Sequence, residues 1–445
     1  MRDMTKGSAF EHLWKYALPL ILGNWFQLGY NAVDSMIAGR FIGKDALAAV
    51  GIAAPVMNLV ILSITGLCLG AGVLMSNFFG AKDFASLRAQ FSTTLLSGMA
   101  LSLLVTLLGM IFALPIMKAL SVPASILDIT LTYVRITFLG APFTFLYNAL
   151  AAALKSIGDS KTPLKFLMFA SILNGILDII FIGFLGFGIV CSATTTVVAE
   201  AVSALLAGIY LIKNIPQLRP HKKEWRIDKS LLVQTVKYGG VTALQQSVQP
   251  IGKLLIQGQV NALGVDVIAA FNAVTKVDAF AFVPQQSIAQ AITTYIAQNR
   301  GAKQEKRIRH GFAVGMVMET CYWIFIGCLT MLFKKPIMSL FVTGETANNI
   351  IGIGAHYLAL MAWFYLLPAM TNGVQGFFRG IGKLKLTLLG TSIQVSGRVI
   401  FTFILAPHLG IAGIAYACVI GWVCMLLVQV PICLYDLHRL NRRSN

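Results

Sequence analysis

Twelve apolar runs divide this chain of 445 residues, and their length constrains its fold more than any other feature. A helix needs about 20 apolar residues to cross the roughly 30 Å of hydrocarbon in a bilayer. Lipid offers the backbone no hydrogen bonds, and the runs lack the two-residue alternation of a membrane barrel, so each is predicted to be a helix. The runs cover residues 13–38, 47–75, 92–116, 130–154, 164–184, 189–213, 231–257, 267–297, 312–333, 350–376, 386–406 and 411–434.

The composition agrees with an all-α polytopic membrane protein and excludes soluble, secreted and disordered classes. Hydrophobic residues make up 57% of the chain and charged residues 12%, with a mean hydropathy of +0.76. Soluble domains carry roughly 25% charged residues. The sequence has no P-loop, and its six His residues lack the spacing of metal ligands. We therefore predict that the protein is not an enzyme, binds no cofactor and does not use ATP directly.

The distribution of basic residues predicts the orientation in the membrane. An even number of spans places both termini on one side, and that side carries 25 of the 35 Lys and Arg residues, against 5 on the other. Basic connections stay in the cytoplasm, so both termini are predicted to be cytoplasmic in a multi-pass protein of the cell inner or plasma membrane. The net charge of +18 then reflects membrane anchoring and not a nucleic-acid partner.

The two halves of the chain repeat each other. Residues 47–49 (LAA) match 268–270 (IAA), and 80–82 (GAK) match 301–303 (GAK), both at an offset of 221. Residues 157–158 (IG) match 381–382 (IG) at an offset of 224. A near-constant offset over this length indicates an internal duplication. The predicted parts are an N-terminal lobe (1–213, helices 1–6), a cytoplasmic linker (214–230), a C-terminal lobe (231–434, helices 7–12) and a cytoplasmic tail (435–445).

Six spans per repeat give both halves the same orientation, related by a pseudo-two-fold axis along the membrane normal. The prediction is therefore twelve transmembrane helices in two pseudo-symmetric six-helix lobes around a central cavity. Rocking of the lobes would open that cavity to alternate sides of the membrane. A duplicated scaffold or a gated channel are the alternative interpretations, but polar side chains in mid-span favour transport.

Polar side chains of the first half gather on few helical faces. Asn24, Gln27, Asn31 and Asp34 are spaced three or four residues apart, which places them on one face, and Pro19 lies before them. Pairs at i,i+4 spacing occur in two further spans: Asn174 with Asp178, and Thr196 with Glu200.

Buried carboxyl groups of this kind suit a coupling ion. Desolvation and a second carboxylate nearby both oppose ionisation, so Asp34 and Asp178 together would take up a proton or a small cation. Oxygen ligands also suit Na⁺. The predicted coupling site therefore contains Pro19 and four residues that could hold a Na⁺, namely Asp34, Asn174, Asp178 and Thr196. Each polar residue alone could instead be a hydrogen-bonding contact between helices.

The second half lacks matching acids, so coupling is predicted in the first half only. Its spans instead carry Lys253, Lys276 and Arg398, with Asp278 and Glu319 as the acids available to pair with them. Ion pairing or snorkelling would explain these cations, and a cavity wall that repels cationic substrate is the sharper hypothesis. The predicted substrate cavity is lined by Gln27, Asn31, Glu200, Gln246, Gln249, Lys253, Lys276, Asp278, Asn372 and Gln375.

Several motifs resemble the multidrug and toxic compound extrusion (MATE) family over essentially the whole chain. They are residues 30–40 (YNAVDSMIAGR) after Pro19, residues 46–51 (ALAAVG) and residues 80–83 (GAKD). The set Pro19, Asp34, Asn174, Asp178 and Thr196 looks like the first-lobe cation site of the DinF-like branch. The resemblance implies exchange of H⁺ or Na⁺ for bulky, often cationic organic compounds. The seventh and tenth spans lack the acids of the NorM-like branch, which argues against a second-lobe Na⁺ site.

The sequence thus predicts a secondary active multidrug efflux antiporter. Inward H⁺ or Na⁺ would drive amphipathic organic compounds outward, with Asp34 and Asp178 as coupling carboxylates and Pro19 letting the first helix bend. A lipid-linked oligosaccharide flippase of the same wider superfamily is the alternative, because Lys253, Lys276 and Arg398 could grip a pyrophosphate. We expect a monomer whose partners are small organic substrates and membrane lipid.

Overall fold

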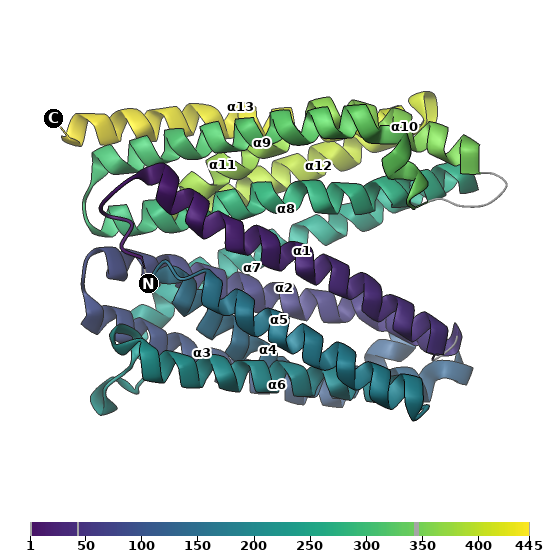
Figure 1. Ribbon diagram of the computed structural model, residues 1–445, viewed down its shortest axis with the longest axis horizontal. Coiled ribbons are helices and arrows are strands. Elements are labelled where there is room, and N and C mark those ends of the chain that lie inside the picture. Colours follow the sequence, from purple (N-terminus) through teal and green to yellow (C-terminus); the bar gives the residue numbers. More distant parts are fainter. Residues whose placement is uncertain (1, 42–43, 342–346, 445) are drawn as a thin grey trace. The chain divides into compact units, whose positions relative to one another are not determined.

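The structure is a computed structural model that describes residues 2–41, 44–341 and 347–444, without the side chains of residues 33–47, 443 and 444. Its regular elements in these ranges are all helical. They are α1 (Ala9–Phe41), α2 (Lys44–Gly80), α3 (Phe84–Ala119), α4 (Ala124–Ser156), α5 (Lys161–Asp178), α6 (Ile189–Asn214), α7 (Lys229–Ala262), α8 (Val265–Gly301), α9 (Glu305–Ser339), α10 (Ala347–Phe364), α11 (Leu366–Gly380), α12 (Leu384–Leu409) and α13 (Ile411–Ser444) (Figure 1).

The prediction of an all-α, multi-span membrane protein is confirmed. Among the described residues, nine helices are long and apolar enough to cross a bilayer, and the bent pair α10 and α11 makes a tenth span. The two remaining predicted runs lie on α1 and α7, which carry Asn and Gln residues within the run. Each of the twelve predicted runs thus lies on one helix or on one pair of consecutive helices.

Helix breaks are the detail that the apolar runs did not reveal. The run 164–184 is α5 followed by a π-helical turn, Ile179–Phe184. The run 350–376 is α10 and α11, which meet at Tyr365 with a bend of 43°. The residue Tyr365 is fully buried, and the Gln285 side-chain amide of α8 donates to its carbonyl oxygen at 3.1 Å. Contacts with a neighbouring helix therefore stabilise this break.

The chain forms two compact units whose boundaries lie inside helices. Unit 1 contains Met1–Arg2 and Leu22–Ala243, and unit 2 contains Asp3–Ile21 and Leu244–Asn445. The first part of α1 therefore belongs to unit 2, and the first part of α7 belongs to unit 1. The predicted linker 214–230 lies within unit 1.

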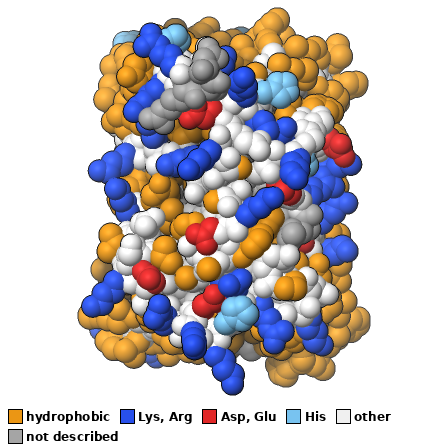
Figure 2. All heavy atoms as spheres, turned by 90° about the vertical axis from the view of Figure 1, so that its left-hand side faces the viewer, with side chains coloured by type: hydrophobic (Ala, Val, Ile, Leu, Met, Phe, Trp, Pro, Cys, Tyr) orange, Lys and Arg blue, Asp and Glu red, His pale blue; other side chains and the backbone are white. Residues whose placement is uncertain are grey.

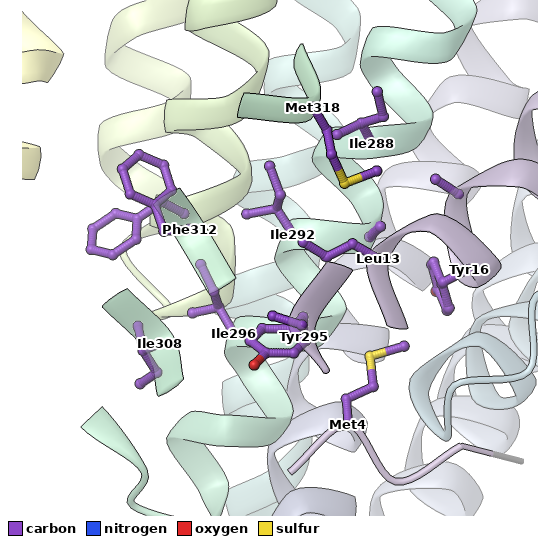
Figure 3. Packing of buried hydrophobic residues seen from close by; sticks show 14 of the residues in the cluster. Met4, Leu13, Tyr16, Ile288, Ile292, Tyr295, Ile296, Ile308, Phe312 and Met318 are labelled. Atoms are coloured by element: carbon purple, nitrogen blue, oxygen red, sulfur yellow. The ribbon is translucent and has the colours of Figure 1, made fainter. Parts of the chain in front are cut away.

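Packing explains why the start of α1 belongs to unit 2. Leu13 and Tyr16 of α1 are fully buried against α8, where Ile292 and Tyr295 lie beside them (Figure 3). The Thr294 hydroxyl of α8 donates to the Tyr16 hydroxyl oxygen at 3.0 Å. Close packing and this hydrogen bond are the interactions that hold helices together within a membrane.

The connection between the repeats contacts α3 within unit 1. Arg88 of α3 donates from Nε to Glu224 Oε2 at 2.8 Å and from Nη2 to Oε1 at 2.9 Å. The backbone N–H of Asp228 donates to the Thr93 hydroxyl at 3.1 Å. The predicted cytoplasmic linker is thus an ordered segment with its own contacts.

The duplicated sequence motifs form duplicated turns. Lys82 and Lys303 both adopt left-handed backbone conformations, with φ of 58° and 55°. Gly158 and Gly382 have φ of 80° and 78°.

The face shown in Figure 2 carries many Lys and Arg side chains, with hydrophobic side chains around its margin.

Candidate functional site

The acid Asp178 ends α5 in unit 1 and is fully buried. Its carboxylate oxygen Oδ1 accepts a hydrogen bond of 2.5 Å from the Thr195 hydroxyl of α6. A hydroxyl bonded to a buried carboxylate offsets part of the cost of removing that charge from water. The π-helical turn begins directly after Asp178, and such turns often occur at functional sites.

Two further residues of the predicted coupling site lie beside this pair. Asn174, one turn before Asp178, is buried, and its amide nitrogen donates to the Thr196 hydroxyl at 3.4 Å. The Asn174 carbonyl oxygen Oδ1 is buried and accepts no hydrogen bond from the described residues. The structure therefore brings Asn174, Asp178 and Thr196 together, and it leaves one amide oxygen available as a ligand.

Thr195 was not among the predicted site residues. The i,i+4 spacing of Thr196 and Glu200 favoured Thr196, but Thr194, Thr195 and Thr196 follow one another. In the structure Thr195 is buried against α5, whereas Thr194 and Thr196 are exposed. Spacing from Asp178 carries no information on which of three consecutive hydroxyls faces the next helix.

Asp34 lies outside the described side chains, but the helix that carries it can be placed. Within unit 1, a Cβ at Gly23 of α1 would lie 2.6 Å from Leu164 of α5, and a Cβ at Gly175 of α5 would lie 4.0 Å from the Tyr30 ring. The earlier residue of α1 lies near the earlier residue of α5, and the later one lies near the later one. The two helices therefore run parallel here. Asp34 follows Tyr30 by four residues, and Asp178 follows Gly175 by three.

The other predicted residues of α1 have different environments. Asn24, Gln27 and Asn31 are exposed in the second part of the helix. Pro19 is buried and lies in the part that belongs to unit 2. The helix continues through Pro19 without a break.

Glu200 forms a separate contact in unit 1. It is partly buried, and its Oε2 accepts a hydrogen bond of 2.5 Å from the Thr144 hydroxyl of α4. Glu200 of α6 is therefore bonded to α4, whereas Asp178 of α5 is bonded to α6.

In unit 2, several predicted cavity residues bond to one another across helices. The Gln245 amide of α7 donates to Gln375 Oε1 at 2.8 Å and to the Thr391 hydroxyl at 3.0 Å. The Gln249 amide donates to Gln394 Oε1 at 2.9 Å. Gln249 and Gln375 thus join α7 to α12 and α11, as the helix-contact interpretation of such residues proposes. Gln245 was missed, although it precedes two Gln residues that were selected.

The remaining residues that were predicted to line the cavity are less buried. Lys253 and Lys276 are exposed, and Gln246, Asp278 and Asn372 are partly buried. The Tyr365 hydroxyl donates to Asp278 Oδ1 at 2.6 Å. Neither Lys253 nor Lys276 lies within 4 Å of a carboxylate oxygen in the described part of the chain, so simple ion pairing does not account for them.

The acid Glu319 of α9 has a different environment from Asp278. It is fully buried, and neither carboxyl oxygen has a hydrogen-bond partner among the described residues. A Cβ at Gly373 of α11 would lie 3.8 Å from Glu319 Cγ, so the side chain packs against that helix. Glu319 is therefore not the counter-charge for the basic residues of unit 2.

Comparisons with known proteins identify the family of the chain. The MatE family model matches residues 19–180 and 242–404, one segment in each repeat. A probable multidrug resistance protein of Bacillus subtilis, YpnP, is 28% identical over 93% of this chain and 92% of its own length. A second probable multidrug resistance protein of that organism, YoeA, is 30% identical over 85% of this chain and 83% of its own.

A solved structure shows the same fold. It is described as the outward-facing conformation of a multidrug resistance MATE family transporter, and it superimposes with a TM-score of 0.91 over 98% of both chains at 21% identity. The family model covers most of this chain and both of its repeats. The chain therefore belongs to the MatE family, the multidrug and toxic compound extrusion transporters.

Proposed function

We propose that the protein is a secondary active antiporter, which exchanges inward H⁺ or Na⁺ for amphipathic organic compounds. The observation that carries the proposal is the burial of Asp178 between two spanning helices, with the Thr195 hydroxyl on one carboxylate oxygen. A charged group at the centre of a spanning helix costs at least about 2.5 kcal/mol, and charged residues within spans commonly serve ion pathways.

The coupling site of this proposal contains Asp34, Asn174, Asp178 and Thr196, together with Thr195. The parallel register of α1 and α5 supports a position for Asp34 at the level of Asp178. The two carboxyl groups would then share a proton or a Na⁺, because neighbouring carboxylates in low dielectric resist full ionisation. The available Asn174 Oδ1 would add a neutral oxygen ligand, of the hard type that Na⁺ prefers.

Ion binding drives transport only if the ion prefers one arrangement of the protein over the other. The proline in α1 supports a moving element, because Pro19 removes one backbone hydrogen bond within a spanning helix. In this mechanism α1 changes its bend with ion occupancy, which moves Asp34 relative to Asp178. The cytoplasmic position of both termini belongs to the same proposal and rests on the distribution of basic residues.

A transport assay in proteoliposomes tests this function. The purified protein is reconstituted with a fluorescent amphipathic dye inside, and a pH gradient and a Na⁺ gradient are imposed separately. Efflux is expected to follow at least one of the gradients and to stop when an ionophore dissipates it. Dye movement that is equal with and without any gradient would contradict antiport and would favour a channel.

A further inference from the structure

A charged cluster in unit 2 has no role in the coupling mechanism above. We call it the cationic cluster, and it draws on α7, α8, α10, α12 and α13 and on the break between α10 and α11. Its members are Lys253, Asp278, Tyr357, Tyr365, Arg398 and Cys418.

The base of the cationic cluster is buried. Tyr357, Tyr365 and Cys418 have exposed fractions of 2%, 0% and 1%. The Cys418 thiol lies within hydrogen-bonding reach of Tyr357 and Arg398. The charged members are more open, since Lys253 is exposed and Asp278 and Arg398 are partly buried. The exposed Lys253 is therefore open to a ligand, while the base holds the charges in position.

The charges of the cationic cluster do not balance. Lys253 and Arg398 lie close enough to repel each other, and both are attracted by Asp278. Two cations thus face one carboxylate, and Tyr365 donates a hydrogen bond to that carboxylate at 2.6 Å. Arg398 Nε is buried and has no acceptor among the described residues. An anionic group would remove both the repulsion and the unbonded donor.

Snorkelling does not relieve Arg398. The residue lies about 16 Å along α12 from the end of the helix at Leu409, at about 1.5 Å per residue. Snorkelling carries Lys and Arg heads to the interface only near helix ends. The guanidinium therefore stays within the unit and needs a partner there.

The partly buried ring of Phe282 adjoins the charges. Phe282 follows Asp278 by one turn of α8, and its ring packs edge-on against Tyr365 and Trp422, with ring centroids 5.5 Å and 6.4 Å apart. Aromatic faces of this kind bind the apolar body of a ligand whose polar end lies elsewhere. The combination suits an amphipathic molecule with a negatively charged end.

We propose that the cationic cluster binds the oxyanion, a carboxylate or a phosphate, of an amphipathic ligand. Arg398 holds the oxyanion by two N–H groups, and Lys253 adds a second charge. The inference rests on the proposed transport function and gives its substrate class, namely zwitterionic or anionic amphiphiles. The ligand could be an exported compound or the headgroup of an anionic lipid, because both present the same chemistry.

Probe binding to the purified protein in an uncharged maltoside detergent tests the site. The probe is 11-(dansylamino)undecanoic acid, compared with its uncharged amide and with the corresponding amine. The wild-type protein is expected to bind the acid at least about 10-fold more tightly than the amide or the amine. Equal affinity for all three would overturn the proposal.

Substitutions then assign the binding to the cluster. Lys253→Gln and Arg398→Gln are each expected to weaken binding of the acid about 10-fold and to leave the amide unchanged, whereas Arg398→Lys retains part of it. Lys385→Gln is the matched control, because Lys385 is an exposed residue at the other end of α12. If Arg398→Gln fails to fold, Lys253→Gln still decides, since Lys253 is exposed. Unchanged affinity in Lys253→Gln would contradict the assignment.

A lipid arm distinguishes the two sources. Protein from vesicles of phosphatidylglycerol and phosphatidylcholine is compared by native mass spectrometry. Retention of phosphatidylglycerol that Lys253→Gln abolishes identifies a lipid headgroup, and acid-probe binding without such retention identifies an exported compound. Neither assay needs an ion gradient, so loss of gradient-driven efflux would refute antiport without touching this site.

Discussion

At the scale of the residue, the coupling proposal depends on one hydroxyl. Thr195→Val removes the donor to Asp178 and keeps the side-chain shape. A hydrogen bond to a charged group contributes about 1.5–3 kcal/mol, so gradient-driven efflux is expected to fall at least about 10-fold. Thr195→Ser should retain most activity.

The matched control for this experiment is Thr194→Val, because Thr194 is exposed one position earlier in the same helix. It is expected to behave as wild type in the same efflux assay. Loss of activity of equal size in both Val variants would show that the effect is general and would remove the specific role of Thr195.

The acid Glu319 provides a second test at this scale. Its carboxyl is fully buried with no partner among the described residues, and an uncompensated charge there would cost several kcal/mol. Gln has the same shape without the charge, so Glu319→Gln should change the free energy of unfolding by less than about 1 kcal/mol, whereas Glu319→Lys should prevent folding. Thermal melting in detergent measures both. A large loss from Glu319→Gln would indicate a hidden ionic contact.

These residues show how much of the site could be predicted from the sequence. Helical spacing placed Asn174 and Asp178 on one face, and both face α6 in the structure. Which hydroxyl meets Asp178 depends on the rotation of α6, which no spacing within α5 reveals. The same limit hid Gln245, whose burial depends on how α7 packs against α11 and α12.

At the scale of the element, the helices followed from the apolar runs but their interruptions did not. Hydropathy indicates which segments lie in lipid, but it carries no information on the hydrogen-bond pattern within a helix. The bend at Tyr365 combines Pro368, which lacks an N–H, with the contact from Gln285 of α8. That contact joins residues far apart in the sequence, so only the folded chain contains the information.

The turn between α4 and α5 yields an element-scale prediction. Gly158 has φ of 80°, and a Cβ there would lie 2.4 Å from the Arg2 carbonyl oxygen. Gly158→Ala is expected to lower the melting temperature, because the left-handed conformation costs a residue with a side chain roughly 1–2 kcal/mol before any clash. Gly258→Ala in α7 is the control, since a Cβ there would meet nothing within 4 Å. Equal melting temperatures for both variants and the wild type would contradict the strained turn.

The connection between the repeats should respond to pH. Arg88 holds the pKa of the Glu224 carboxyl below its ordinary value of 4.5. The stabilisation is therefore present above that value and is lost as the pH falls through the lowered pKa. The two side chains are partly exposed, with exposed fractions of 16% and 19%, so Glu224→Gln should cost about 1 kcal/mol.

Hydrogen exchange of the connection measures this effect. Residues 215–228 are expected to exchange faster in Glu224→Gln at neutral pH, and in the wild type once the pH falls below the pKa of Glu224. Glu11→Gln, which breaks the exposed pair with Lys15 in α1, should leave the connection unchanged. Equal protection of the connection in Glu224→Gln and the wild type would show that the ion pair does not order it.

At the scale of the whole molecule, the duplication appears both in sequence and in structure. The unit boundaries in α1 and α7 lie 222 residues apart, between the two offsets that relate the repeats. Unit 1 thus contains the first part of α7, which belongs to the second repeat, and unit 2 contains the first part of α1, which belongs to the first repeat. Sequence offsets reveal the duplication, but this exchange depends on packing of Leu13 and Tyr16 against α8.

The central claim is that a buried carboxylate in unit 1 couples an ion gradient to export. The most direct test is dye efflux from proteoliposomes that contain Asp178→Asn, with Asp128→Asn as a control at an exposed position of α4. We predict that Asp178→Asn still binds the dye but loses gradient-driven efflux, and that Asp128→Asn transports as wild type. Efflux by Asp178→Asn at the wild-type rate, under the same gradient, would contradict the account.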